Sequence, residues 1–139
     1  MNEQPKGRVL GVGGIFFRSA DPAGLAAWYQ QALGLVIEAW GTTHGTSFSP
    51  QAMPANAFSV WSTFAADTEY FGDLRQSFMI NLVVDDLDAA LANVEAAGGE
   101  VVQDREEHDF GRFGWFVDPD GNRVELWEPP ETIPENGDE

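Results

Sequence analysis

The clearest alternation of hydrophobic and polar positions lies near the C-terminus, in residues 113–129. Aromatic and β-branched residues lead into the sequence Asp-Pro-Asp-Gly-Asn at 118–122, where proline presets φ and glycine supplies a positive φ. Residues 124–127 then alternate again, and this alternation places Glu125 and Trp127 on one face of a strand. The pattern therefore predicts a β-hairpin that carries a carboxylate beside a tryptophan.

Two other stretches have apolar residues at helical spacing. The first follows Asp21, a predicted N-cap, and ends at Gly34, a predicted C-cap. The second follows Asp85 and Asp86 and closes at the glycine pair 98–99. The predicted buried stripes are Leu25, Trp28, Tyr29, Ala32 and Leu33 in the first helix, and Leu87, Leu91 and Val94 in the second.

Short apolar runs around both helices predict strands. A turn at 41–45 and a loop at 51–56 interrupt the first set, and the polar, acidic segment 65–77 is the predicted linker. The predicted strands are 10–18, 35–40, 46–49, 57–64, 78–84, one that starts at Val101 before a charged run, and the two strands of the final hairpin. The order is therefore β-α-β-β-β, repeated once.

The two halves align as an internal repeat. A shift of 65 residues places Asp21 on Asp86, and a shift of 66 residues places Trp61 on Trp127. Helix caps and strand ends thus recur at spacings that agree within one residue, which indicates a duplicated module.

Composition places the chain among single-domain globular proteins. With 139 residues, 43% of them hydrophobic, it is long enough to bury a core. A net charge of −16 repels nucleic acid and anionic membranes, so neither is an expected partner. The absence of cysteine excludes disulfides and thiol chemistry and fits a cytoplasmic location, as does the polar N-terminus. We expect a cytoplasmic protein with an acidic tail at 130–139.

Three motifs in this order resemble the vicinal oxygen chelate superfamily, which includes glyoxalase I, bleomycin-resistance proteins and extradiol dioxygenases. They are residues 21–34, residues 84–90 and residues 118–129. The resemblance spans about residues 9–129, as one domain made of two βαβββ modules at about 9–64 and 78–128. It implies an α+β fold in which a mixed sheet curves around one cleft with the helices outside, commonly assembled as a homodimer.

The resemblance also implies where a metal would be held. Family members place a ligand on the first strand of each module and a carboxylate on the last. Carried over, the first-strand positions are Gly14 and Met79, and the last-strand positions are Ser59 or Val60 and Glu125. Only Glu125 can ligate a divalent ion, whereas catalytic zinc needs about three protein ligands. We therefore expect a degenerate metal site and no cofactor.

Polar residues near these positions have a functional and a structural interpretation. Glu125 is a candidate general base or anchor for a polar ligand group, or a carboxylate hydrogen-bonded to Asn81 or a Trp indole. Asn81 lies in an apolar strand and either binds ligand or makes a core hydrogen bond. Arg18 points a cation into the cleft or pairs with an acid. His44, in a predicted turn, and His108, in a predicted acidic loop, match no family position.

Aromatic residues provide the remaining candidates. Trp61, Trp115 and Trp127 line an apolar pocket or simply belong to the core. Tyr70 and Phe71 lie in the linker, where a lid or a dimer contact is expected. The complete candidate set is Glu125 as base, with Asn81, Met79, Arg18, Trp61, Tyr70 and Trp115 as ligand-binding residues.

Three functions remain open, and the fold resemblance alone does not choose between them. The favoured one is a metal-independent, small-molecule-binding protein that takes an apolar or aromatic compound in the cleft. The second is a lyase, isomerase or dioxygenase that uses Glu125 as base or metal ligand. The third is a structural or regulatory dimer with a vestigial cleft. The sequence contains no GxSxG, no phosphate-binding glycine loop and no HExxH.

Overall fold

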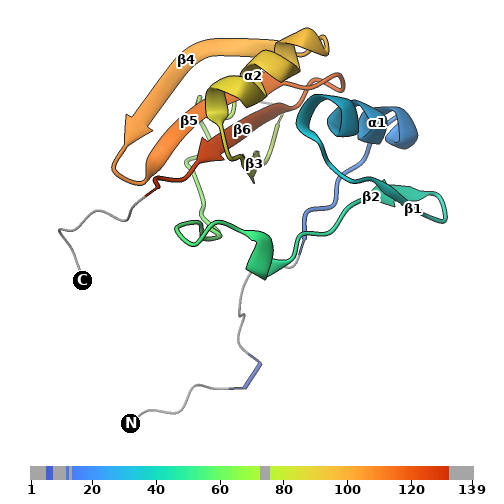
Figure 1. The fold of residues 1–139 in the computed structure, drawn as a ribbon, viewed down its shortest axis with the longest axis horizontal. Helices are drawn as coiled ribbons and strands as arrows, with labels where there is room; N and C mark the ends of the chain where they lie inside the picture. The colour runs from blue at the N-terminus through green and yellow to red at the C-terminus, as the bar shows by residue number, and fades with distance from the viewer. Residues whose placement is uncertain (1–5, 8–11, 13, 73–75, 132–139) are drawn as a thin grey trace.

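The computed structural model describes residues 6–7, 12, 14–72 and 76–131. Its first half holds helix α1, a two-stranded hairpin and one short 3-10 helix, and its second half holds a four-stranded sheet with helix α2 (Figure 1). The elements are α1 (Pro22–Leu33), β1 (Glu38–Trp40), β2 (Thr43–Gly45), η1 (Pro50–Ala52), β3 (Ile80–Val83), α2 (Leu87–Ala96), β4 (Glu100–His108), β5 (Gly111–Val117) and β6 (Arg123–Glu128).

The four-stranded sheet is mixed. Its strand order is β3-β6-β5-β4, with β6 parallel to β3 and antiparallel to β5, and β5 antiparallel to β4. The chain order β3-α2-β4-β5-β6 is the βαβββ arrangement predicted for the second half. A parallel pair needs a long crossover, and here the segment from α2 to β5 supplies it. The α+β class and the final hairpin are confirmed.

Both helices begin at the predicted aspartates. Asp21 Oδ1 accepts a hydrogen bond from Gly24 N at 3.0 Å, and Asp86 Oδ1 accepts one from Ala89 N at 3.0 Å. Each carboxylate thereby satisfies a backbone donor that has no partner within its helix. Gly34 ends α1 in the left-handed conformation, with φ of 75°, as the sequence predicts.

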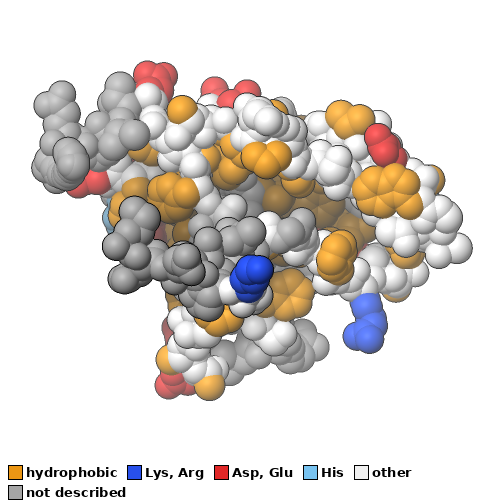
Figure 2. Space-filling model, turned by 90° about the horizontal axis from the view of Figure 1, so that it is seen from below, with side chains coloured by type: hydrophobic (Ala, Val, Ile, Leu, Met, Phe, Trp, Pro, Cys, Tyr) orange, Lys and Arg blue, Asp and Glu red, His pale blue; other side chains and the backbone are white. Residues whose placement is uncertain are grey.

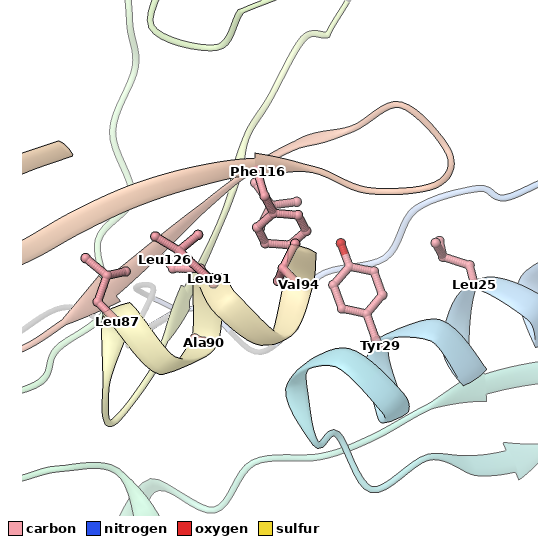
Figure 3. Packing of buried hydrophobic residues seen from close by; sticks show 9 residues of the cluster. Leu25, Tyr29, Leu87, Ala90, Leu91, Val94, Phe116 and Leu126 are labelled. Atoms are coloured by element: carbon pink, nitrogen blue, oxygen red, sulfur yellow. The ribbon is translucent and has the colours of Figure 1, made fainter. Parts of the chain in front are cut away.

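The hydrophobic core lies between the helices and one face of the sheet (Figure 3). Phe116 of β5 is completely buried, and its ring lies 6.3 Å from that of Tyr29 and 5.8 Å from that of Trp28. Helix α1 therefore packs against the second half of the chain. The buried cluster consists of Leu25, Tyr29, Leu87, Ala90, Leu91, Val94, Phe116, Val124 and Leu126. Each large side chain buried here stabilises the fold by roughly 1.5–3 kcal/mol.

A buried hydrogen bond ties α1 to the turn between β5 and β6. The hydroxyl of Tyr29 donates to Asp118 Oδ2 at 2.8 Å, and Asp118 is only 4% exposed. Asp118 Oδ1 also accepts from the backbone amides of Asp120 and Asn122, each at 2.9 Å. The aspartate of the predicted turn therefore holds both the turn and the first helix.

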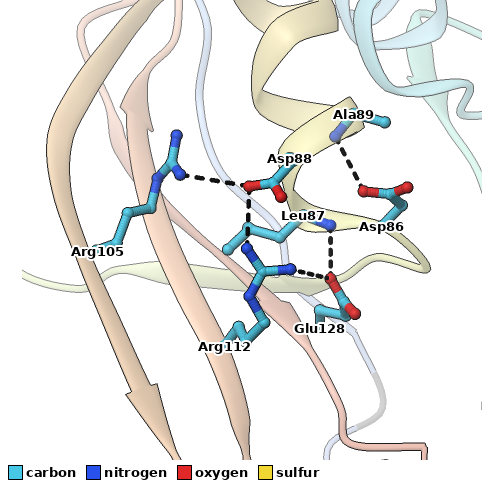
Figure 4. Close-up of polar contacts among 7 residues, drawn as sticks. All are labelled: Asp86, Leu87, Asp88, Ala89, Arg105, Arg112 and Glu128. Carbon is cyan, nitrogen blue, oxygen red and sulfur yellow. Dashed lines mark hydrogen bonds and ion pairs between the residues drawn. The ribbon is translucent and has the colours of Figure 1, made fainter.

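A polar network joins the end of β6 to the start of α2 (Figure 4). Glu128 Oε1 accepts from Leu87 N at 2.8 Å and from Arg112 at 3.2 Å. Asp88 pairs with Arg112 at 3.0 Å and with Arg105 at 3.4 Å. Carboxylates are favourable at a helix N-terminus, so the network stabilises the docking of α2.

The first half contains less sheet than the alternation predicts. Of the predicted strands, residues 12, 14–18, 46–49 and 57–64 are not in strands, and residues 10, 11 and 13 lie outside the described residues. The predicted strand 35–40 is shortened to β1, and β2 occupies the predicted turn, with His44 in it. Strand propensity reflects packing against neighbouring strands, and these runs remain exposed, as Phe16 does at 91%.

Strand β4 is longer than predicted. The charged run at 104–107 continues the strand, and His108 is its last residue rather than part of a loop. Strand β4 lies at the edge of the sheet, where charged side chains reach water and oppose pairing with other chains. The prediction that the charged run forms a loop was therefore wrong, because this run belongs to an exposed edge strand.

No helix among the described residues is both long enough and apolar enough to cross a membrane.

Candidate functional site

Strand register places Glu125 at the middle of the sheet. Its neighbours Val124 and Leu126 are fully buried in the core that α2 covers, so Glu125 lies on the opposite face. Across the ladder, Glu125 is paired with Asn81 of β3 on one side and Trp115 of β5 on the other. Three predicted site residues thus lie side by side on one sheet face.

Three neutral side chains donate hydrogen bonds to the Glu125 carboxylate. Asn81 Nδ2 donates to Oε1 at 2.7 Å, and Trp115 Nε1 donates to Oε2 at 3.1 Å. The hydroxyl of Tyr70 also donates to Oε2. Glu125 is only 6% exposed, and a carboxylate buried to this degree requires such donors. The structural interpretation from the sequence predicts Asn81 or a Trp indole as the partner of Glu125, and both donate to it here.

Tyr70 reaches Glu125 from the segment between the two halves. Two turns shape this segment: Thr68 N donates to Ala65 O, and Gly72 N donates to Glu69 O, both at 3.0 Å. Burial raises the pKa of Tyr70 well above its ordinary value, and the hydrogen bond and negative charge of Glu125 raise it further. The hydroxyl therefore stays protonated at neutral pH and remains a donor.

The Tyr70 ring lies in a small aromatic slot. Phe64 stacks on it, with ring centroids 5.5 Å apart and planes 13° apart. The ring of Trp115 meets it edge to face at 5.8 Å and 88°. Phe71 packs on Phe64 at 5.1 Å. These are the offset-stacked and T-shaped geometries that aromatic pairs prefer. Phe64 is therefore a site residue that was not predicted, although it ends a predicted aromatic strand.

Arg123 lies on the same sheet face as Glu125. Its guanidinium lies 5.4 Å from the centre of the Trp115 ring, within cation–π distance. The Gln76 side chain makes two hydrogen bonds to the backbone of Arg123. Its Oε1 accepts from Arg123 N and its Nε2 donates to Arg123 O, each at 2.8 Å. No acidic side chain in residues 14–72 or 76–131 forms an ion pair with Arg123. Nothing in the local sequence had marked Gln76.

A second aromatic group lies along β6 from Glu125. The rings of Trp127 and Phe113 stack at 6.1 Å with planes 8° apart, and Phe58 contacts Trp127 at 5.0 Å. The Trp127 indole donates to the carbonyl of Phe110 at 2.7 Å. Aromatic rings therefore lie next to the carboxylate in two directions, across the sheet at Trp115 and along β6 at Trp127.

Three predicted site residues do not join this group. Met79 precedes β3 and is half-buried, and among the described residues it makes no hydrogen bond to Glu125. Arg18 lines a separate open cavity of about 510 Å³ together with Phe16, Phe17 and Phe78. Trp61 is 81% exposed. The structure brings together Glu125, Asn81, Tyr70 and Trp115, whereas Met79, Arg18 and Trp61 make no hydrogen bond to Glu125 among the described residues.

The donor set at this place does not fit a divalent metal. Among the residues that the structure describes, no three His, Asp or Glu side chains lie together as a metal-binding group. Glu125 already accepts from three donors, and Asn81 presents its amide nitrogen to the carboxylate. His108 lies at the end of β4, 3.1 Å from Glu106. A metal would need about two further ligands that these residues do not supply.

The sequence matches the Glyoxalase-like domain family over residues 14–127, and the chain belongs to this family. No curated protein sequence matches it. TnmS3, an antibiotic-binding protein from Streptomyces sp. CB03234, is similar in structure, with 19% identity, a TM-score of 0.54, and coverage of 88% of this chain and 98% of that chain. A Glyoxalase/bleomycin resistance protein/dioxygenase superfamily member from Sphaerobacter thermophilus DSM 20745 has 21% identity and a TM-score of 0.53, covering 86% and 98%. The resemblance seen in the motifs is confirmed.

Proposed function

We propose that the protein is a metal-independent, small-molecule-binding protein that holds an apolar or aromatic compound against the sheet face of Glu125. One observation carries the proposal. A buried carboxylate with three neutral donors has aromatic rings next to it across the sheet, at Trp115 and Tyr70, and along β6, at Trp127. Ligand sites are built in this way, from aromatic walls with a few polar groups that fix orientation.

The family comparison supports the same function. TnmS3, whose fold is similar, is an antibiotic-binding protein. Identity of 19% supports a common fold and leaves the ligand of this chain to be determined by its own residues.

An enzymatic role for Glu125 is less well supported. A general base must bring a carboxylate oxygen to the substrate proton. Here Asn81 engages Oε1, while Tyr70 and Trp115 both engage Oε2. These hydrogen bonds would also have to break before Glu125 could ligate a metal. If Glu125 only anchors a ligand, it needs neither to accept a proton nor to bind a metal.

We also propose that about residues 9–64 form the first of two βαβββ modules and that the sheet is completed in a homodimer. The first half carries large exposed side chains, among them Phe16, Val36 and Trp61 at 91%, 72% and 81%. Figure 2 shows hydrophobic side chains spread across the face seen from below. Exposed apolar surface of this extent marks an interaction surface. Sedimentation velocity should give twice the mass of the chain, and a monomer at micromolar concentration would contradict the dimer.

Tryptophan fluorescence titration tests the binding function. Trp115 donates to Glu125, so a compound bound at the carboxylate should change its emission. We expect saturable changes with planar aromatic compounds and loss of this response in Glu125→Gln. The matched control is Glu95→Gln, because Glu95 is an exposed residue of α2 on the other side of the sheet. Turnover of a bound compound that Glu125→Gln abolishes would instead favour the enzyme.

A further inference from the structure

Tyr70 is an aromatic ring with a hydroxyl that the chain itself places in the aromatic slot against Glu125. We propose that Tyr70 is an intramolecular occupant of the ligand site, displaced by planar aromatic ligands that carry a neutral O–H or N–H donor, phenols foremost. This inference rests on the proposed binding function and names the ligand class.

Tyr70 is the exchangeable donor among the three. Asn81 and Trp115 lie in strands on either side of Glu125, and the backbone ladder fixes their register. Tyr70 lies 55 residues before Glu125 in the chain, on a segment shaped by local turns. The ladder keeps the backbones of Asn81 and Trp115 beside Glu125, whereas Tyr70 lies outside the sheet and can move away from the carboxylate as a whole residue without disturbing the ladder.

The acceptor capacity of Glu125 favours one donor in place of Tyr70. A carboxylate offers about four acceptor positions, two on each oxygen. Trp115 and Tyr70 occupy both positions of Oε2, and Asn81 occupies one of Oε1. A ligand hydroxyl or amine that replaces the Tyr70 hydroxyl keeps Oε2 satisfied. A purely apolar compound that displaced Tyr70 would leave the second acceptor position of Glu125 Oε2 without a donor.

The slot accepts one planar ring. Phe64 covers one face of the Tyr70 ring, and the Trp115 ring meets it at 88°. A flat aromatic ligand keeps both contacts when it takes the same place, whereas a bulky aliphatic one cannot stack on Phe64. The walls therefore select the shape of the ligand.

Charge restricts the ligand to neutral or cationic donors. A carboxylate only accepts hydrogen bonds, so an anionic group facing Glu125 would meet a like charge without a bridging proton. The raised pKa of Tyr70 is consistent with a site that holds its occupant in the protonated form, because burial and Glu125 both oppose ionisation. Arg123, whose guanidinium lies over the Trp115 ring, is the nearby cation. A preference for anionic ligands would therefore point to Arg123, rather than Glu125, as the group that binds the ligand.

Isothermal titration calorimetry on the full chain tests the inference with p-cresol, toluene and p-toluic acid. Tyr70→Phe keeps the ring and loses the hydroxyl, so it competes less well with the ligand. We expect p-cresol to bind Tyr70→Phe about tenfold more tightly than wild type, the scale of one hydrogen bond to a charged acceptor. Tyr70→Ala should bind p-cresol more tightly than toluene or p-toluic acid. Adding Glu125→Gln should remove that preference.

The matched control is Phe48→Ala, which truncates an aromatic side chain that is 67% exposed and lies outside the slot. Circular dichroism verifies the fold of each variant. Equal affinities of wild type and Tyr70→Phe, or a preference for p-toluic acid, would overturn the inference and leave the binding function intact. Absence of binding of any aromatic compound to wild type and to every variant would overturn the binding function itself.

Discussion

Asn81 and Glu125 lie directly opposite each other on parallel strands β3 and β6, and Asn81 Nδ2 donates to Glu125 Oε1 at 2.7 Å. The pairing joins the first and last strands of one βαβββ unit. It explains why a polar residue stands in an otherwise apolar strand, because a buried carboxylate needs a neighbouring donor.

Glu125→Gln should destabilise the protein. Glutamine has one acceptor oxygen, so it cannot accept from Asn81, Tyr70 and Trp115 in the same geometry, and at least one of these donors loses its partner. Each such loss costs about 1–3 kcal/mol in the free energy of unfolding. Urea unfolding followed by fluorescence measures it. Glu95→Gln should change the free energy by less than about 0.5 kcal/mol, as exposed substitutions do; equal effects would show that the three hydrogen bonds contribute little.

Tyr29→Phe should lower the thermal midpoint. The change removes the 2.8 Å hydrogen bond to Asp118 while keeping the buried ring. Hydrogen bonds to charged groups contribute about 1.5–3 kcal/mol to the free energy of unfolding. The loss in Tyr29→Phe should lie near the lower end of this range, because two backbone amides still donate to Asp118. Calorimetry measures the change. A midpoint equal to that of wild type would mean that the turn holds without α1.

Leu91→Ala should be among the most destabilising substitutions. Leu91 is 2% exposed and packs between α2 and the sheet, close to Gly114. Truncating a buried leucine removes apolar contacts and leaves a cavity, which costs about 2–5 kcal/mol. Chemical unfolding of Leu91→Ala beside Phe48→Ala provides the comparison, and the exposed Phe48 should show little effect. A loss below 1 kcal/mol for Leu91→Ala is inconsistent with the described core.

Stability should fall in alkaline solution. Burial and the neighbouring Asp118 raise the pKa of Tyr29 far above the value of about 10 for an unfolded tyrosine. Below pH 10 the tyrosine is protonated in both states and its contribution is fully present. Above pH 10 the unfolded state loses its proton while the folded state keeps it, so unfolding becomes easier by up to about 1.4 kcal/mol per pH unit. Urea midpoints from pH 8 to 11 measure this loss, which should be smaller in Tyr29→Phe; an equal loss would place its cause elsewhere.

Local chemistry made the helices and the final hairpin predictable from sequence. Asp21 and Asp86 cap their helices by hydrogen bonds to backbone amides three residues later in the chain, and Gly34 ends α1 by its left-handed backbone conformation. Strands of the first half were harder to predict, because pairing depends on distant neighbours that alternation does not reveal. Residues 57–64 have the pattern of a strand and form no ladder.

The candidate site was predictable only where strand register decides it. Alternation placed Glu125 on the face opposite Val124 and Leu126, and the apolar surroundings of Asn81 indicated a partner for it. Phe64 and Gln76 could not be placed, since their contacts depend on the path of the segment between the halves. Trp61, given by the repeat as the counterpart of Trp127, is exposed because its half lacks the corresponding strand.

The most direct test of metal-independent binding at Glu125 is fluorescence titration of the EDTA-dialysed protein with planar aromatic donors such as p-cresol and larger phenols. The account predicts saturable binding whose affinity is unchanged by EDTA and lost in Glu125→Gln but not in Glu95→Gln. Binding that requires an added divalent metal, or that is identical in Glu125→Gln and wild type, would contradict it.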